Sequence, residues 1–238
     1  MSDSQDSSAD GNGFHPAAAP ADVDLTARRH EMIERQLRKR GIRDERVLAA
    51  MLSVPRHQFV APEFAADAYS DHPLPIGHGQ TISQPFMVAA MAEALELSGS
   101  ERVLEIGAGS GYQAAVLSLL AREVHTVEMQ EDLALMSAER LGRLRYGNVH
   151  VHVGDGTLGW PQEAPFDAIV VTAAAPEIPP PLAAQLANGG RLIIPVGTPE
   201  EQRLLRADKR DNALSTRPLY HCRFVPLLGQ YGWKPNLD

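Results

Sequence analysis

Acidic side chains stand at three points where predicted strands end. Glu105 lies just before a cluster of glycines, Glu128 ends the predicted strand 123–128 (EVHTVE), and Asp155 lies in the turn after the next strand. The carboxyl ends of parallel strands share one edge of a sheet, and ligands bind along that edge. We therefore expect the three carboxylates to gather around one ligand.

The glycine cluster, Gly107-Ala108-Gly109-Ser110-Gly111, indicates what that ligand is. It lies between an apolar run and a helical pattern that begins at Gln113. Its G-x-G-x-G spacing is one residue shorter than the G-x-G-x-x-G of dinucleotide sites. A carboxylate at Glu105 would repel a pyrophosphate, but it suits the amine of an amino acid. The pattern favours S-adenosylmethionine, which carries an amine and a sulfonium, over NAD; a plain tight turn is the alternative.

Two further acids have candidate roles at the same edge. Glu128 follows Gly107 by 21 positions, close to the spacing at which an acid binds a ribose diol. A solvated strand end is the alternative interpretation. Asp155 is placed to accept a hydrogen bond from an adenine amino group, and ordinary turn chemistry is the alternative for it.

A long segment before the glycine cluster is the candidate for substrate recognition. Residues 69–84, YSDHPLPIGHGQTISQ, contain two prolines and two glycines and have no helical period. Connections of this length are usually functional or disordered, and the apolar Leu74, Ile76 and Ile82 argue against disorder. A helix is predicted to follow, and Ser83 is well placed as its N-cap.

Apolar runs and helical patterns alternate along the chain, which predicts an α/β fold. The predicted strands are residues 103–106, 123–128, 149–153, 166–172 and 191–196, and the predicted helices are residues 24–40, 44–54, 85–97, 113–121, 131–145 and 179–187. Two final strands, residues 202–209 and 217–225, flank a turn at residues 210–212 and predict an antiparallel hairpin at a sheet edge. This layout matches a Rossmann-like S-adenosylmethionine-dependent methyltransferase, with a mostly parallel sheet and helices on both faces.

The domain organisation follows from composition. Residues 1–23 are polar and contain almost no large apolar side chain, so we predict a disordered tail. The rest, residues 24–238, is expected to form one domain. Its parts are N-terminal helices with the substrate loop (24–100), a cofactor-binding core (101–200) and a C-terminal hairpin and tail (201–238).

Charge and composition exclude several classes of protein. The net charge of −8 and the pI of about 5.6 argue against nucleic acid as a partner, and the arginines of residues 28–40 are better explained by a solvated helix face than by an RNA patch. No apolar run is long enough to span a membrane. One cysteine, Cys222, and no secretory signal predict a cytoplasmic protein. The nine histidines are scattered without an H-x-x-x-H pair, so no metal site is expected.

Four segments resemble the protein-L-isoaspartate O-methyltransferase family. They are residues 76–85 (IGHGQTISQP), 103–115 (VLEIGAGSGYQAA), 166–174 (FDAIVVTAA) and 189–197 (GGRLIIPVG), and the resemblance covers roughly residues 28–228. The chain has neither the D/N-P-P-Y-like cluster of an adenine amino-methylase nor the clustered carboxylates of a metal-dependent catechol-type enzyme. Phe86 departs from the tyrosine often found in bacterial members.

The resemblance implies an enzyme that methylates the free α-carboxylate of L-isoaspartyl residues in damaged proteins and peptides. It implies that Ser83 is the catalytic residue and that Ile76, Gly77, His78 and Ser83 bind the substrate. The implied residues for S-adenosyl-L-methionine are Gln80, Thr81, Ile82, Ser83, Glu105, Gly107, Ala108, Gly109, Glu128, Asp155 and Gly156. Activity on D-aspartyl residues is left open, and we expect a monomer. The alternatives are a small-molecule or RNA methyltransferase with the same cofactor domain and, more distantly, a cofactor-binding module without activity.

Overall fold

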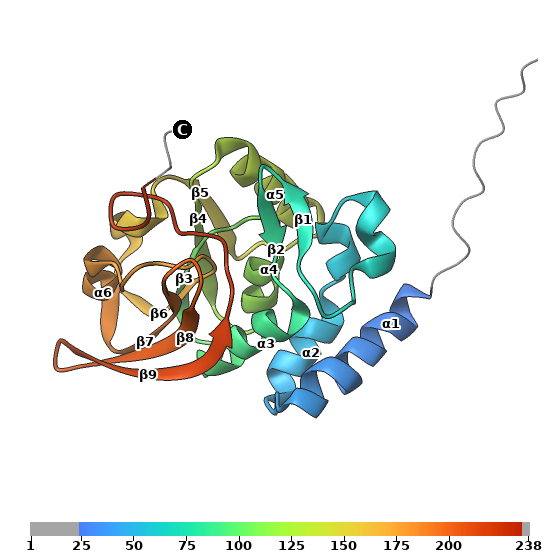
Figure 1. Cartoon of the computed structure of the whole chain (residues 1–238), viewed down its shortest axis with the longest axis horizontal. Coiled ribbons are helices and arrows are strands. Elements are labelled where there is room, and N and C mark those ends of the chain that lie inside the picture. The colour runs from blue at the N-terminus through green and yellow to red at the C-terminus, as the bar shows by residue number, and fades with distance from the viewer. Residues whose placement is uncertain (1–23, 235–238) are drawn as a thin grey trace, which may run out of the picture.

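A seven-stranded sheet with the strand order β5-β4-β3-β6-β7-β8-β9 forms the centre of the computed structural model, which describes residues 24–234 (Figure 1). Its strands are β3 Arg102–Ile106, β4 Glu123–Glu128, β5 Val149–Val153, β6 Phe166–Val171, β7 Leu186–Gly197, β8 Gln202–Arg210 and β9 Ala213–Cys222. The five neighbouring strands β5, β4, β3, β6 and β7 are parallel to one another. Strand β8 pairs antiparallel with β7, and β9 pairs antiparallel with β8. The predicted α/β fold is confirmed, whereas the predicted tail lies outside the described residues.

Two apolar cores cover the two faces of this sheet. Successive side chains of a strand point to opposite faces, and Val103 accordingly belongs to one core while its neighbour Leu104 belongs to the other. The first core packs the sheet against α2 Glu45–Ser53, α3 Pro85–Ala94 and α4 Tyr112–Ser118. The second contains Leu182 of α6 Pro180–Gln185. Helix α5 Glu131–Arg143 follows β4 and packs beside it and β5.

The N-terminal helical segment changes its winding twice. Helix α1 Leu25–Glu31 continues as a π-helical turn over Met32–Leu37 and a 3₁₀ turn over Arg38–Arg40, and Gly41 ends the segment at a φ of 103°. Arginines of this segment pair with acids, as in the contacts of Arg35 with Glu31 and of Arg38 with Glu34. These pairs agree with a solvated helix face. None of the helices within the described residues is long and apolar enough to cross a lipid bilayer.

The predicted substrate loop is a β-hairpin rather than an irregular loop. Strand β1 Leu74–Gly77 pairs antiparallel with β2 Gln80–Ile82, and the buried side chains of Leu74 and Ile82 lie opposite each other. Its tight turn uses His78 and Gly79, which both have a positive φ, of 52° and 69°. Two short strands joined by such a turn leave too little sequence to show an alternating pattern.

The expected capping role of Ser83 is wrong. Helix α3 has Gln84 as its N-cap residue, and no side chain provides a capping hydrogen bond. The helix begins with Pro85, which has no amide hydrogen and therefore needs one capping partner fewer. The hydroxyl of Ser83 is left available for another role.

The C-terminal hairpin is longer than predicted because its turn has two residues. Asp211 and Asn212 both adopt a positive φ, of 50° and 62°, so β9 begins at Ala213 instead of residue 217. Acidic and amide side chains tolerate this conformation, which joins twisted strands tightly. The first residues of β9 lie mostly exposed at the sheet edge and carry no apolar pattern.

Two arginines of the sheet anchor the C-terminal end of α3. Arg191 of β7 donates hydrogen bonds to the carbonyl oxygens of Leu95 and Glu96, and Arg206 of β8 donates one to that of Ala94 at 2.9 Å. The last carbonyls of a helix have no partner within it, and basic side chains satisfy them. This anchor fixes α3, and with it the segment of Ser83, against the sheet.

Replacing Arg206 with alanine should destabilise the protein by about 1.5–3 kcal/mol, the range for hydrogen bonds that involve a charged group. Its guanidinium also pairs with Glu96 at 2.6 Å and Asp208 at 2.8 Å, and its side chain is only 10% exposed. Urea denaturation measures the change. The control is Arg203→Ala on the same strand, whose exposed pair with Glu201 should contribute less than about 1 kcal/mol. Equal losses for both variants would contradict the anchor.

Candidate active site

A cavity opens at the carboxyl ends of the central strands. It is lined by nine of the residues predicted from the sequence, namely Gln80, Thr81, Ile82, Ser83, Gly107, Ala108, Gly109, Glu128 and Gly156. The first four come from the β1-β2 hairpin and the short link to α3, and the others follow β3, end β4 or follow β5. Segments far apart in the sequence therefore meet at the edge of the sheet where such folds bind ligands.

The floor of this cavity is backbone, held close by neighbouring side chains. A Cβ atom on Gly107 would lie 2.4 Å from the Thr172 hydroxyl, and one on Gly156 would lie 2.5 Å from Cγ2 of Ile106. The Thr172 hydroxyl lies within hydrogen-bond distance of the carbonyl oxygens of Ile106, at 3.0 Å, and of Gly107, at 2.8 Å. A side chain at either position would collide with these neighbours, so glycine lets the main chain pack directly against Thr172 and Ile106.

The carboxylate of Glu128 is held at the cavity wall by backbone amides. The amide of Gly109 donates to Oε2 at 2.9 Å, and the amide of Gln130 donates to Oε1 at 3.1 Å. The residue is only 8% exposed and lines the cavity. Each carboxylate oxygen retains acceptor capacity beyond its amide bond. Glu128 is therefore rigid and able to accept two hydroxyl groups of one ligand.

A second cavity adjoins the first and shares four of its lining residues. These are Thr81, Ser83, Thr172 and Val225. Its outer wall includes Arg40, Phe86 and Tyr220, with the Arg40 guanidinium 3.6 Å from the Phe86 ring centroid and the Phe86 and Tyr220 rings packed edge to face. Ser83 thus stands where two neighbouring ligands would meet, an arrangement suited to group transfer.

Glu105 lies behind the cavity wall and does not line it. Its side chain is fully buried, and neither carboxyl oxygen has a hydrogen-bond partner among the described residues. Burial raises the pKa of Glu105 to about 8; the neighbouring Thr126 hydroxyl opposes this shift, and the charge of Glu128 adds to it. The geometry therefore gives no direct contact between Glu105 and a ligand amine, and the group is largely protonated at neutral pH.

Asp155 and the β1-β2 turn also lie outside both cavity walls. One carboxylate oxygen of Asp155 accepts hydrogen bonds from the amide and hydroxyl of Thr157, and the other accepts one from the amide of Gln230 at 2.8 Å. These hydrogen bonds correspond to the alternative role of Asp155, in which its side chain stabilises the turn after β5. Ile76, Gly77 and His78 line neither cavity, although Cδ1 of Ile76 lies close to the cavity residue Gly109, 3.3 Å from where a Cβ atom would stand.

Several lining residues were missed by the sequence analysis. Thr172 stands directly after β6, at the carboxyl end of a parallel strand, which is the same signal that marks the three acids. Residues 225–228 line the cavity because the chain returns to residue 174, where the Leu227 amide donates to the Ala174 carbonyl at 2.7 Å. No sequence signal marks this return, because it depends on tertiary pairing.

Similarity to known proteins places the chain in a family. A family model described as Protein-L-isoaspartate(D-aspartate) O-methyltransferase (PCMT) matches residues 27–232. The chain belongs to this family. It is 57% identical over 206 residues to the protein-L-isoaspartate O-methyltransferase of Geobacter metallireducens, covering 86% of this chain and 95% of that one. A relative with the same name from Methanoculleus marisnigri is 57% identical over 210 residues, which are 88% of this chain and 96% of that one.

Solved structures agree with this family assignment. A protein-L-isoaspartate O-methyltransferase superposes with a TM-score of 0.78 at 32% identity, over 86% of this chain and 67% of that one. A Plasmodium falciparum protein assigned to the same activity, solved in complex with S-adenosyl-L-homocysteine, gives a TM-score of 0.71 at 30% identity, over 84% of this chain and 98% of that one. The family resemblance noted in the sequence is confirmed.

The raised pKa of Glu105 predicts how stability depends on pH. Below the ordinary pKa of 4.5, the Glu105 carboxyl is protonated in both the folded and the unfolded protein. Between pH 4.5 and about 8 it is ionised in the unfolded chain but still protonated in the folded protein. The contribution of Glu105 to wild-type stability therefore falls as pH rises through this window. Glu105→Gln removes the effect, so its stability relative to wild type should be greater at pH 8 than at pH 5, by more than about 1.4 kcal/mol, the equivalent of one pKa unit.

Urea denaturation at the two pH values measures this difference. Glu131→Gln, at an exposed position, serves as the control and should show no such trend. A difference between Glu105→Gln and wild type that is the same at both pH values would contradict the raised pKa.

Proposed function

We propose that the two adjoining cavities carry out methyl transfer from S-adenosyl-L-methionine to the free α-carboxylate of L-isoaspartyl residues, with Ser83 at the point of transfer. Family membership assigns the reaction and the cofactor class. The observation that supports the residue assignments is that Ser83, Thr81 and Thr172 belong to the walls of both cavities. A cofactor in one cavity and a substrate in the other would meet at these side chains.

The first cavity fits the cofactor. Bound S-adenosyl-L-methionine supplies a methyl group on a cationic sulfonium. The bare backbone at Gly107 and Gly109 lets its amino-acid portion approach closely, and the fixed carboxylate of Glu128 accepts hydrogen bonds from its ribose. Gly156, which also lines this cavity, packs directly on Ile106 and would adjoin the adenine. Neither Asp155 nor Glu105 lines the cavity, so neither side chain is assigned a direct contact with the cofactor.

The reaction requires no general base. An α-carboxyl group has an ordinary pKa near 3.5, so it is ionised at neutral pH. With the cofactor bound, one carboxylate oxygen would accept its methyl group, and the sulfur would keep the electron pair of the broken carbon–sulfur bond. The protein must align the reactants and exclude water. The Ser83 hydroxyl, which has no capping role, donates a hydrogen bond to the carboxylate oxygen that does not attack.

The second cavity provides the substrate side. Damaged sites occur in many sequences, so recognition should depend on the substrate backbone and the position of its carboxylate more than on neighbouring side chains. Exposed backbone of β9 beside Tyr220 is available to an extended peptide, because β9 is the last strand of the sheet. A cytoplasmic location and a monomeric state stay predictions.

Glu128→Ala should weaken cofactor binding by about 10- to 100-fold, because it removes charge-assisted hydrogen bonds worth roughly 1.5–3 kcal/mol. Calorimetry with S-adenosyl-L-homocysteine measures the affinity of the folded variant. Glu131→Ala, an exposed acid three residues on, is the matched control and should bind normally. Unchanged affinity in Glu128→Ala would remove this residue from the ribose site.

The enzyme should methylate a peptide that contains isoaspartate and should not methylate the same peptide with normal aspartate. The two carboxylates have similar basicity, so discrimination must come from geometry: isoaspartate moves the side-chain methylene into the backbone. Release of radiolabelled methyl ester measures the reaction. Equal methylation of both peptides would overturn the proposed substrate.

Ser83→Ala should lower the turnover number on the isoaspartyl peptide by about 10- to 100-fold while it leaves cofactor affinity and melting temperature nearly unchanged. The control is Ser53→Ala, at an exposed position at the end of α2, which should preserve turnover. Full turnover in folded Ser83→Ala would exclude the assigned hydrogen bond without affecting the substrate assignment.

A further inference from the structure

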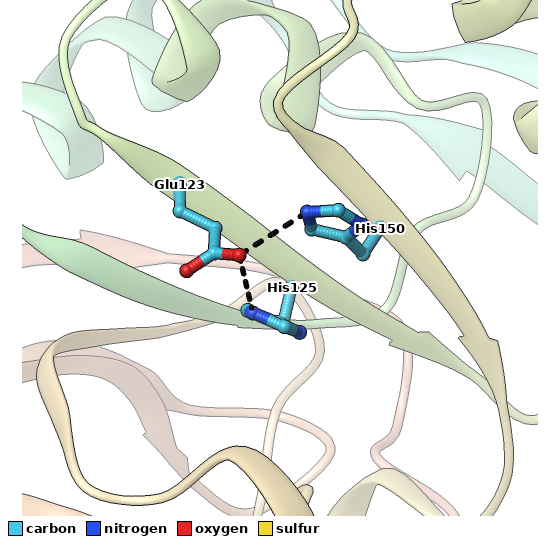
Figure 2. Close-up of side chains that lie close together, drawn as sticks. All are labelled: Glu123, His125 and His150. Atoms are coloured by element: carbon cyan, nitrogen blue, oxygen red, sulfur yellow. Dashed lines mark ion pairs between the residues drawn. The ribbon is translucent and has the colours of Figure 1, made fainter.

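A second group of chemically capable side chains lies at the opposite end of the sheet from the cofactor cavity. Glu123 and His125 of β4 and His150 of β5 point toward one another (Figure 2). His125 and His150 are direct neighbours in the parallel pairing of these strands. Glu123 opens β4 and Glu128 closes it, so at about 3.3 Å per residue the backbone positions of Glu123 and His125 are about 16 Å and about 10 Å from that of Glu128. None of its three residues lines either cavity of the proposed methyl-transfer site.

The strand pairing overturns the sequence interpretation of scattered histidines. Glu123 and His125 are two residues apart on β4, and His150 and His152 are two residues apart on β5. Alternation places both members of each pair on the same face, and parallel register then joins the pairs. Metal ligands with this spacing come from neighbouring strands and need no H-x-x-x-H pattern.

The buried histidine of this group has one nitrogen without a hydrogen-bond partner. His125 is 3% exposed, and its Nδ1 lies 3.0 Å from Nε2 of His152. Its Nε2 has no hydrogen-bond partner among the described residues and lies 3.5 Å from Oε1 of Glu123. A buried polar atom of this kind calls for a specific explanation, such as an ion.

The distances between the three ligand atoms suit a small divalent ion. Zn²⁺ binds nitrogen and carboxylate oxygen at about 2.0–2.2 Å, which separates the ligand atoms of a tetrahedral site by about 3.3 Å. Oε1 of Glu123 lies 3.2 Å from Nε2 of His150 and 3.5 Å from Nε2 of His125, and all three atoms lie within 4.8 Å of one another. The side chain of His150 is 47% exposed, which gives an ion access from solvent.

Neighbouring residues orient these ligands as the outer shell of a metal site does. Arg102 donates from Nε to Oε2 of Glu123 at 3.0 Å, which leaves Oε1 directed at the histidines. Glu163 pairs with the same arginine at 2.7 Å and offsets its positive charge. His152 contacts the far nitrogen of His125 and stacks on the Trp160 ring at 4.1 Å, so its own orientation is fixed.

We propose that Glu123, His125 and His150 form a binding site for Zn²⁺ that is separate from the methyl-transfer site. Imidazole nitrogen with one carboxylate suits zinc better than Ca²⁺ or Mg²⁺, which prefer oxygen ligands. Three protein ligands leave a fourth position for water on the exposed side of His150. The ion joins the edge strand β5 to β4 and so stabilises this end of the sheet.

Calorimetric titration of the tag-free, chelator-treated full chain with Zn²⁺ tests the site. One ion should bind per chain, and saturating Zn²⁺ should raise the melting temperature because it binds the folded state. His150→Ala removes an exposed ligand without disturbing the core and should lower the affinity at least tenfold. Glu123→Gln, which keeps the shape of the side chain but removes its charge, should also weaken binding.

The matched control is His30→Ala, which removes an exposed histidine of α1 and should leave Zn²⁺ binding unchanged. Addition of S-adenosyl-L-homocysteine should not displace the ion, because the two sites lie at opposite ends of β4. The proposal is overturned if the wild-type chain shows no saturable binding, or if His150→Ala binds Zn²⁺ as well as wild type does.

Discussion

The hydrogen bond from the Gly109 amide to the Glu128 carboxylate is the interaction on which the active site depends. It ties the turn after β3 to the end of β4, and the amide of Gly107 adds a second tie to the Val127 carbonyl at 2.8 Å. The turn is thereby fixed before any ligand arrives, so little ordering entropy opposes binding. The same bond sets the direction of the carboxylate that would accept the ribose hydroxyls.

The substrate side is fixed by a different set of contacts. Helix α3 is buried along most of its length, and arginines from β7 and β8 hold its C-terminal carbonyls. The β1-β2 hairpin leads directly into this helix, so Ser83 is positioned by elements that are themselves packed on the sheet. Two independently anchored segments therefore face each other across the junction of the two cavities, as a transfer reaction between two bound molecules requires.

Much of the fold could be predicted from the sequence because the central strands are short segments with regularly placed apolar side chains and clear ends. The bounds of β4 and β5 agree with their predicted ranges, since polar residues or a glycine close each run. The β1-β2 hairpin was not predicted, because its strands are short and its turn places His78, rather than a glycine, at a positive φ. The histidine cluster and the pairing of residues 225–228 with residue 174 depend on contacts between segments far apart in the chain. No short stretch of sequence indicates such contacts, so neither could be predicted.

Some residues of the predicted site line the cavity and others do not, and the difference follows from side-chain direction. The glycines and Glu128 line the cavity, whereas Glu105 shares its face of β3 with Val103 and points into the core. The most direct test of the account is a crystal structure with S-adenosyl-L-homocysteine and an isoaspartyl peptide. We expect the ribose hydroxyls to bind Glu128 and the peptide carboxylate to lie within hydrogen-bond distance of the Ser83 hydroxyl. A peptide carboxylate bound away from Ser83 would contradict it.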